Sequence, residues 1–310
     1  MNRKLLTENV RLSKLLGQKQ ETDREERQNK EQVDASIYTV IKLATVEDIR
    51  KQVGESGLEL VDHEACRRFR VNKQTPFVDF KRQVTAELGV PMERQRYWTW
   101  AKRQNQTIRP RRVLLPEEEA RTVSQAQKST LFGSAPVTFD FKLFLEVVSD
   151  PEAATSAATR ARSGGRACEG LLVPSIVPVS HILLFFKLYD PLAETLRFIG
   201  HLLLDQESCM LDNKHGVLKL AAGSLCSAEE MALYEEIRNE PTIFCEKMKW
   251  DACLKKVSQL QNGDIICLQP EIPQSKSHKG EVRFETVPRY LEDIRYIQQR
   301  QREISDRRYG

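Results

Sequence analysis

One order of strand and helix signals occurs twice along this 310-residue chain, and it constrains the fold more than any other feature. Each copy opens with two segments rich in β-branched and aromatic residues, continues with a short amphipathic helix, and ends with further strand-like segments. The first copy covers residues 36–148 and the second covers 181–270. A chain of this length has room for two domains, and the repeat predicts where each one lies.

The first copy has clear start and stop signals. Thr75 is expected to cap a helix with Pro76 in its first turn, and Gly89 stands where a helix often ends. An apolar stripe at helical spacing lies between them: Phe77, Phe80, Val84 and Leu88. The strands are expected at 37–43, 66–71, 96–101 and 141–148. The stretch that contains Gly54 and Gly57 is expected to be a loop.

The second copy follows the same order. Its strands are expected at 182–189, 195–202, 230–237 and 265–268. An Asp-Pro pair at 190–191 predicts a turn that makes the first two strands a hairpin. Asp212 is expected to cap a helix that ends at Gly223, and the Asn-Gly-Asp string at 262–264 predicts a tight turn directly before the last strand.

A hairpin, a helix and then further strands is the order of the β-grasp, or ubiquitin-like, fold. The sequence therefore predicts an α+β protein with two tandem ubiquitin-like domains, at 36–148 and 181–270, flanked by charged helices. Residues 1–35 are expected to form a charged connecting helix and 271–310 a charged helical tail. Residues 149–180 are too poor in apolar surface to order themselves, which predicts a flexible low-complexity linker and independent motion of the two domains.

The composition argues against several classes of function. There are 48 basic and 44 acidic residues, and a net charge of +4 does not by itself indicate nucleic acid. The seven cysteines are odd in number and contain no C-x-x-C pair, which predicts reduced thiols and no metal site. Because there is neither a long apolar run nor a signal-peptide core, no membrane segment is expected, and the expected locations are nucleus and cytoplasm.

A catalytic site is not expected either. His63 lies three residues before Cys66, but a cysteine protease normally takes its base from a distant part of the sequence. The acids Asp62 and Glu64 would raise the pKa of this thiol, whereas a catalytic thiol needs a lowered one. No glycine-rich phosphate loop stands between a strand and a helix. The sequence predicts a protein that is not an enzyme and that needs no cofactor.

A basic segment at 94–112 contains no acid. Its seven basic residues are Arg94, Arg96, Lys102, Arg103, Arg109, Arg111 and Arg112. Tyr97, Trp98 and Trp100 lie among them, and aromatic rings beside cations are typical of single-stranded nucleic-acid binding. The favoured alternative is that both tryptophans are buried between a β-grasp sheet and its helix, while the basic residues lie on a solvated loop.

Several strings are more specific than a strand or helix pattern. In the second copy they stand at 188–191, 199–201, 233–237 and 262–266. In the first copy they stand at 69–71, 73–77 and 100–107. Together they resemble the ubiquitin-like region of the herpesvirus-associated ubiquitin-specific protease family, the first copy most strongly in its plant-type form. The resemblance covers roughly residues 30–300.

In that family, a papain-like protease domain precedes a charged connecting helix and a row of ubiquitin-like domains that bind partner proteins. The resemblance implies that residues 2–34 are the connecting helix, that the protease domain is absent from this sequence, and that a third ubiquitin-like domain would begin near Gly310. It implies a non-catalytic protein-interaction module for ubiquitin-pathway or chromatin-associated proteins. The alternative is a fragment that regulates a full-length protease in trans.

The resemblance also suggests a site. In the animal member of the family, an acidic cluster around the turn before the last strand of the second domain accepts lysine-rich peptides. Among the matching residues 258–264 only Asp264 is acidic, so lysine-motif binding at this turn is expected to be weak or lost. The candidate partner-binding residues are this turn and two other surfaces: Asn262, Gly263, Asp264, Glu235, Glu236, Arg109, Arg111 and Arg112.

Overall fold

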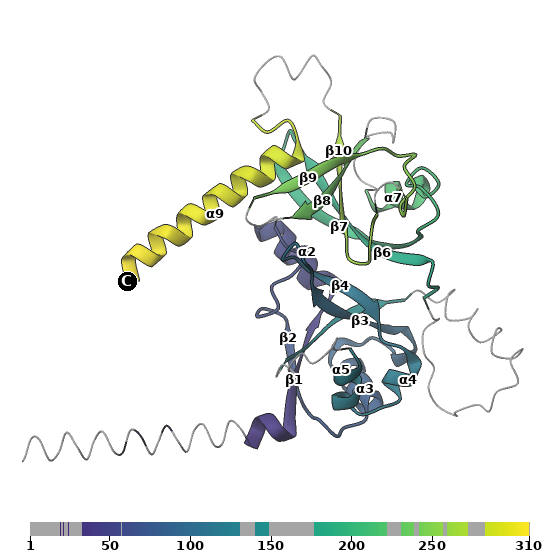
Figure 1. Ribbon diagram of the computed structural model, residues 1–310, viewed down its shortest axis with the longest axis vertical. Coiled ribbons are helices and arrows are strands. Elements are labelled where there is room, and N and C mark those ends of the chain that lie inside the picture. The colour runs from purple at the N-terminus through teal and green to yellow at the C-terminus, as the bar shows by residue number, and fades with distance from the viewer. Residues whose placement is uncertain are drawn as a thin grey trace, which may run out of the picture.

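Two five-stranded sheets make up the framework of the protein (Figure 1). The computed structural model describes residues 19, 21, 24, 33–56, 58–130, 140–148, 177–221, 231–238, 242–256, 259–271 and 283–309. Most of the charged helix predicted at 1–35, most of the linker predicted at 149–180, and Gly223 lie outside the described residues. We call residues 38–148 the first unit and residues 177–270 the second unit.

The first sheet is mixed. Its strands are β1 (Tyr38–Ala44), β2 (Arg67–Asn72), β3 (Gln95–Lys102), β4 (Ile108–Val113) and β5 (Asp140–Val147). They lie in the order β2-β1-β5-β3-β4, in which β1 and β5 are parallel and all other neighbours are antiparallel. The first strand, β1, and the last strand, β5, are therefore neighbours at the centre of the sheet. On its other side β1 pairs with β2, and β5 pairs with β3.

The second sheet repeats this arrangement. Its strands are β6 (His181–Asp190), β7 (Thr195–Asp205), β8 (Met231–Arg238), β9 (Phe244–Met248) and β10 (Ile265–Pro270). The order is β7-β6-β10-β8-β9, with β6 and β10 parallel at the centre and antiparallel neighbours elsewhere. The internal repeat that the sequence predicts is thus present in the order and direction of the strands. The strands β4 and β9 were not expected from the sequence.

Helices pack on the faces of both sheets. They are α2 (Val46–Ser56), α3 (Phe77–Leu88), α4 (Pro116–Glu119), α5 (Val123–Ser129), α7 (Lys214–Leu220) and α9 (Val287–Tyr309), with a 3-10 turn η1 (Met92–Arg94). Buried side chains of α3 and α5 form one core with the first sheet, and α7 contributes to the core of the second sheet. The charged helix α9 extends away from the second unit (Figure 1). None of the helices in the described part of the chain has the length and apolar character needed to cross a membrane.

The helix α3 forms from local signals. Its apolar stripe is buried, as expected for residues at helical spacing: Phe77, Phe80 and Val84. Gly89 ends the helix in the left-handed region, at φ 69°, and its amide donates to the carbonyl of Thr85 at 2.9 Å. Pro76 rather than Thr75 is the residue directly before the helix, and no side chain caps it.

The helix α2 stands where the sequence analysis expected a loop, so that expectation was wrong. The Asp48 carboxylate accepts from the amide and the hydroxyl of Thr45, at 2.8 and 2.7 Å, while the Asp48 amide donates back to that hydroxyl at 3.3 Å. This is the reciprocal arrangement of a capping box, which favours a helix start despite Gly54 in the last turns. Ile49 and Val53 of this helix are buried.

The helix α7 also begins differently from the prediction. Asn213, not Asp212, precedes the helix, and neither side chain caps its amides. The Asp212 carboxylate instead accepts a hydrogen bond from the amide of Cys209 at 2.9 Å. The carboxylate therefore stabilises the turn before the helix rather than the first turn of the helix itself.

The tryptophans of β3 face away from α3, which corrects the predicted burial against that helix. Trp98 is only 1% exposed, but it belongs to a core shared with Phe185 of the second unit, and Trp100 lies against the same core. The ring that faces the helix is Tyr97, at 5.3 Å from Phe77. Side chains alternate along a strand, and here the second unit covers the face that would otherwise meet water.

One apolar cluster spans both units. Its members include Ala44, Ile49, Val53 and Phe144 of the first unit and Leu183, Phe185, Tyr189 and Phe198 of the second. The rings of Phe144 and Phe185 are 5.4 Å apart, and α2 lies against β7. Each large apolar side chain removed from water contributes roughly 1.5–3 kcal/mol, so the units form one body. The predicted independent motion is wrong, because linker composition carries no information about the sheet faces that meet.

Candidate functional site

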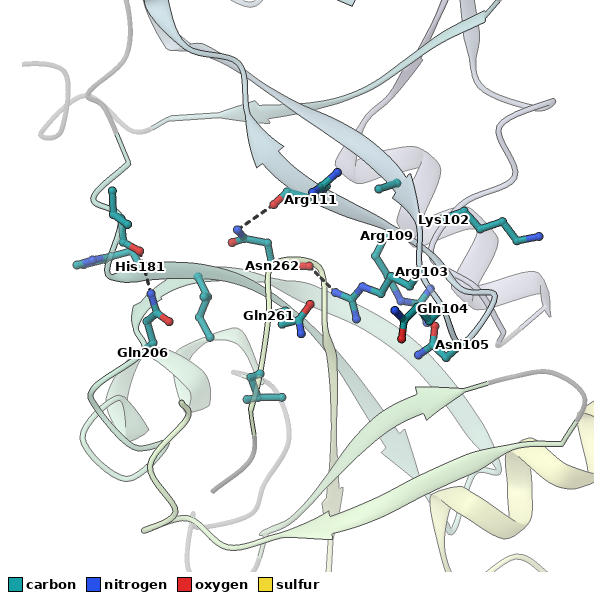
Figure 2. A pocket seen from close by; sticks show the side chains of 14 residues that line it. Lys102, Arg103, Gln104, Asn105, Arg109, Arg111, His181, Gln206, Gln261 and Asn262 are labelled. Carbon is teal, nitrogen blue, oxygen red and sulfur yellow. Dashed lines mark hydrogen bonds between the residues drawn. The ribbon is translucent and has the colours of Figure 1, made fainter. Parts of the chain in front are cut away.

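A turn of the second unit meets the β3–β4 hairpin of the first. The guanidinium of Arg103 donates to the Asp264 carboxylate. It also donates, at 2.5 Å, to the carbonyl of Asn262 (Figure 2). The Asn262 amide donates to the carbonyl of Arg111 at 2.9 Å, and its side-chain oxygen accepts from the amide of Leu183 at 2.8 Å. The predicted tight turn is therefore a structural link between the units. We call these contacts the hairpin–turn contact.

Gly263 fits this contact because it has no side chain. Its φ is 87°, in the region that favours glycine. A Cβ at this position would lie 2.5 Å from the carbonyl oxygen of Pro110 and 2.9 Å from the Cβ of Arg109. The backbones of the turn and of β4 therefore approach each other so closely that a side chain at position 263 would force one of them to shift.

A buried chain of charges lies beside the turn. Arg109 is 1% exposed, and its guanidinium stands 3.2 Å from the Glu59 carboxylate and 3.8 Å from that of Glu236. Glu236 also accepts from the ammonium of Lys187 at 2.6 Å, and both of these side chains are buried. A lysine in the centre of an apolar strand was the sequence signal for this cluster, since a buried cation needs a buried anion.

Glu235 is not an acidic attractor at neutral pH. Burial, together with the nearby carboxylates of Asp264 and Glu246, raises the pKa of Glu235 to about 8, and Arg103 opposes this only in part. Its side chain is therefore mostly protonated at pH 7. Two acids that the sequence suggested as a surface pair thus differ, because Glu236 is ionically paired inside the molecule and Glu235 is largely neutral.

Most of the basic segment is paired with carboxylates. The pairs are Arg96–Glu146 at 3.1 Å, Arg103–Asp264, Arg109–Glu59 at 3.2 Å and Arg112–Glu118 at 2.7 Å. Burial would raise the pKa of Glu118, but hydrogen bonds from Arg112 and the amide of Leu115 lower it to about 2. Part of the segment is the strand β4, so the predicted solvated loop is confined to the hairpin connection.

The eight candidate residues thus fall into three groups. Five of them form or adjoin the hairpin–turn contact: Asn262, Gly263, Asp264, Arg109 and Glu236. Glu235 lies beside it and Arg111 joins it through its carbonyl, with an exposed side chain. Arg112 lies apart, paired inside the first unit. The sequence analysis missed Arg103, Glu59 and Lys187 as members of the site, although Arg103 stands in the basic segment.

An open groove of about 960 Å³ lies along this contact (Figure 2). Its walls are the β3–β4 hairpin on one side and, on the other, the start of β6, Gln206 at the end of β7, and the turn. The charged or titratable residues that line it are Lys102, Arg103, Arg109, Arg111 and His181. No Asp or Glu is among the lining residues in the described part of the chain. The basic residues of the groove therefore lie on its hairpin wall, with His181 on the opposite wall.

The thiol that lies near a histidine is not activated. Burial, with Asp48 and Asp62 nearby, raises the pKa of Cys66 to about 12, and the thiol donates to the carbonyl of Asp62 at 3.3 Å. Burial lowers the pKa of His63 to about 4, and its ring stands edge-on to Trp100 at 4.7 Å. Among the described residues, no group of three or more His, Cys, Asp or Glu side chains is arranged to hold a metal ion.

The family match covers this same region. A family model described as the ICP0-binding domain of Ubiquitin-specific protease 7 matches residues 95–302, more than half of the chain. The chain belongs to this family. The ICP0-binding-domain match begins at β3 and ends in α9, so it includes both sides of the hairpin–turn contact. The resemblance inferred from the sequence strings is confirmed.

Relatives match most of this chain but only a small part of themselves. Ubiquitin C-terminal hydrolase 13 of Arabidopsis thaliana is 38% identical over 285 residues, and Ubiquitin C-terminal hydrolase 12 of the same plant is 37% identical over 288 residues. Each alignment covers 91% of this chain and 23% of the relative. Ubiquitin carboxyl-terminal hydrolase 5 of Schizosaccharomyces pombe is 24% identical over 260 residues, which cover 81% of this chain and 20% of the relative. This member of the ICP0-binding-domain family thus spans about a quarter of the length of its curated plant relatives.

Proposed function

We propose that the chain is a protein-interaction module without catalysis of its own, and that its two units bind a partner as one rigid pair. The observation that carries the proposal is the family match at 95–302, which runs from the hairpin of the first unit through the whole second unit. Because the matched region includes the packed contact between the units, it presents surfaces of both units to a partner in a fixed relative orientation. Such preorganisation lowers the entropy cost of binding.

Each unit is, in this proposal, a ubiquitin-like domain. The support is the strand order, since in each sheet the parallel first and last strands lie at the centre, with the second strand outside the first. A helix follows the second strand in both units. The proposed partners are proteins of the ubiquitin pathway or of chromatin, and the proposed locations are nucleus and cytoplasm.

Lysine-rich ligands are not the proposed partners of the turn at 262–264. Its one carboxylate, Asp264, is 6% exposed and already accepts from Arg103 and from the amide of Gln261 at 2.6 Å. A lysine would have to displace an arginine that is held in place by the same chain. The geometry supports the expectation that lysine-motif binding is weak at this turn.

Nucleic acid is the less favoured class of partner. The rings that the basic segment would offer to stacked bases, Tyr97 and Trp98, are buried, and Trp100 is covered in part. Binding to single strands takes much of its energy from such stacking. A regulatory role in trans, on a hydrolase like the plant relatives, remains the second proposal, and it is supported by the names of those relatives.

Affinity capture with the full chain after nuclease treatment tests the proposal. The expected result is that a specific set of proteins is retained, and that the same set is retained by an Arg82→Glu control on the exposed side of α3. Retention of nucleic acid alone, released by salt, would replace the proposal with the nucleic-acid alternative. Retention of nothing beyond bare resin after nuclease would contradict the proposed function.

A further inference from the structure

We infer that the groove between the two units binds an acidic, extended peptide. The inference rests on the proposed function and names the chemistry of the partner. An acidic turn would select a basic ligand, whereas the inferred ligand is acidic. The inference comes from which charged side chains of the hairpin–turn contact line the groove.

The carboxylates of this region are turned away from the groove. Asp264, Glu236 and Glu59 engage Arg103 and Arg109, and none of the three is among the lining residues. The groove keeps the cationic side of these pairs and adds two exposed side chains, Lys102 and Arg111. Among the residues that the structure describes, a ligand in the groove therefore meets basic side chains and no carboxylate, which favours an anionic ligand.

The groove is held open by the same contact that forms its walls. The bond between the Asn262 amide and the Arg111 carbonyl ties the turn to the hairpin, and Gly263 lies directly against Pro110. A preformed cleft costs a ligand little in rearrangement of the protein. Its volume of about 960 Å³ lies at the upper end of the usual range for ligand clefts, which suits several residues of a peptide.

The polar groups of the groove suit a peptide rather than a nucleic acid. Gln104 and Gln261 are exposed amides on opposite walls, able to bond a peptide backbone. None of the described residues that line the groove is aromatic, so they offer bases no stacking surface. Lys102 of β3 pairs with Ile108 of β4, and Arg111 follows on β4, so both exposed basic residues belong to the same hairpin.

Two double variants with the same change of net charge distinguish binding in this groove from attraction to the overall charge of the protein. Lys102→Glu/Arg111→Glu reverses the two exposed cations of the groove. Arg82→Glu/Lys128→Glu makes the same change of net charge at exposed positions of α3 and α5, which cover the face of the first sheet away from the second unit. All four side chains are at the surface, so circular dichroism and thermal melting should be close to wild type for both variants.

The experiment is fluorescence anisotropy of the full chain with three labelled probes: a Glu/Ser decapeptide, a Lys/Ser decapeptide and a dT oligonucleotide. The Glu/Ser peptide should bind the wild type and weaken with added salt, the groove variant should lose about tenfold in affinity, and the control variant should retain it. Equal loss in both variants, preference for the Lys/Ser peptide, or groove-dependent binding of the oligonucleotide alone would overturn the inference. Protein capture after nuclease without Glu/Ser binding would leave the interaction module standing and remove only the groove.

Discussion

The guanidinium of Arg103, just past the end of β3, donates to the carboxylate of Asp264, which lies 161 residues further along the chain. The two residues come from surfaces that the sequence suggested as separate binding faces, one basic and one acidic. In the folded protein each surface satisfies the other. What remains available to a partner is the outer side of this contact, whose described lining residues are basic or uncharged.

Replacement of Gly263 by alanine, compared with the same change at Gly89, should separate the cost of a positive φ from the cost of a steric clash. Gly263→Ala is expected to cost about 3 kcal/mol of unfolding free energy, because a Cβ would meet the Pro110 carbonyl at 2.5 Å in addition to the strain of a positive φ. Gly89→Ala is the matched control, since its φ is also positive but nothing lies within 4 Å of the added Cβ. Its expected cost is about 1 kcal/mol. Urea denaturation measures both, and equal costs would contradict the account.

Glu235→Gln should change how stability depends on pH. The pKa of Glu235 is raised from about 4.5 to about 8, so the folded chain keeps a proton that the unfolded chain loses. Its contribution to stability is therefore full below pH 4.5 and is lost as pH rises through 8. The unfolding free energy of the variant should equal that of wild type near pH 4.5 and exceed it by roughly 2 kcal/mol above pH 8. This is less than about 1.4 kcal/mol for each unit of pKa shift, because solvent screens the charge at this site.

The measurement is urea denaturation of both proteins at steps of pH from 4.5 to 9. Taking the difference between variant and wild type removes the titration of His63 and His201, whose pKa values are lowered by burial in both proteins. A difference that does not grow with pH would show that Glu235 titrates as an ordinary surface carboxyl.

The buried pair of Lys187 and Glu236 should behave as a unit. Lys187→Met leaves Glu236 buried beside Arg109 alone, and Glu236→Leu leaves two cations without their shared anion. Each single change is expected to destabilise by about 3–5 kcal/mol, and the double variant should cost less than the sum. Thermal or urea unfolding of the four proteins measures this. Additive costs would mean that the two charges do not stabilise each other.

The local structure was largely readable from the sequence, and the contact between units was not. Signals that act within a few residues, such as the stripe ending at Gly89, predicted α3 well. The capping box of Thr45 and Asp48 was also present, but the nearby glycines hid the helix it starts. Strand alternation placed Trp98 on a face without telling what covers that face.

The candidate site shows the same limit. The sequence selected Asp264 and the basic segment because of their charge, and charge alone does not say which residue pairs with which. A contact across 161 residues depends on how two sheets meet, and no local pattern records that. The one available hint was Lys187 in an apolar strand, which required a buried carboxylate such as Glu236.

The central claim is that the hairpin of the first unit and the turn of the second stabilise each other within one chain. A double-mutant cycle of Arg103→Ala and Asp264→Ala, followed by urea denaturation of the full chain, tests it most directly. The account predicts a coupling free energy of about 1–2 kcal/mol, because the pair is largely buried and charge-assisted. Additivity of the two changes to within about 0.5 kcal/mol would contradict the contact and the groove that it shapes.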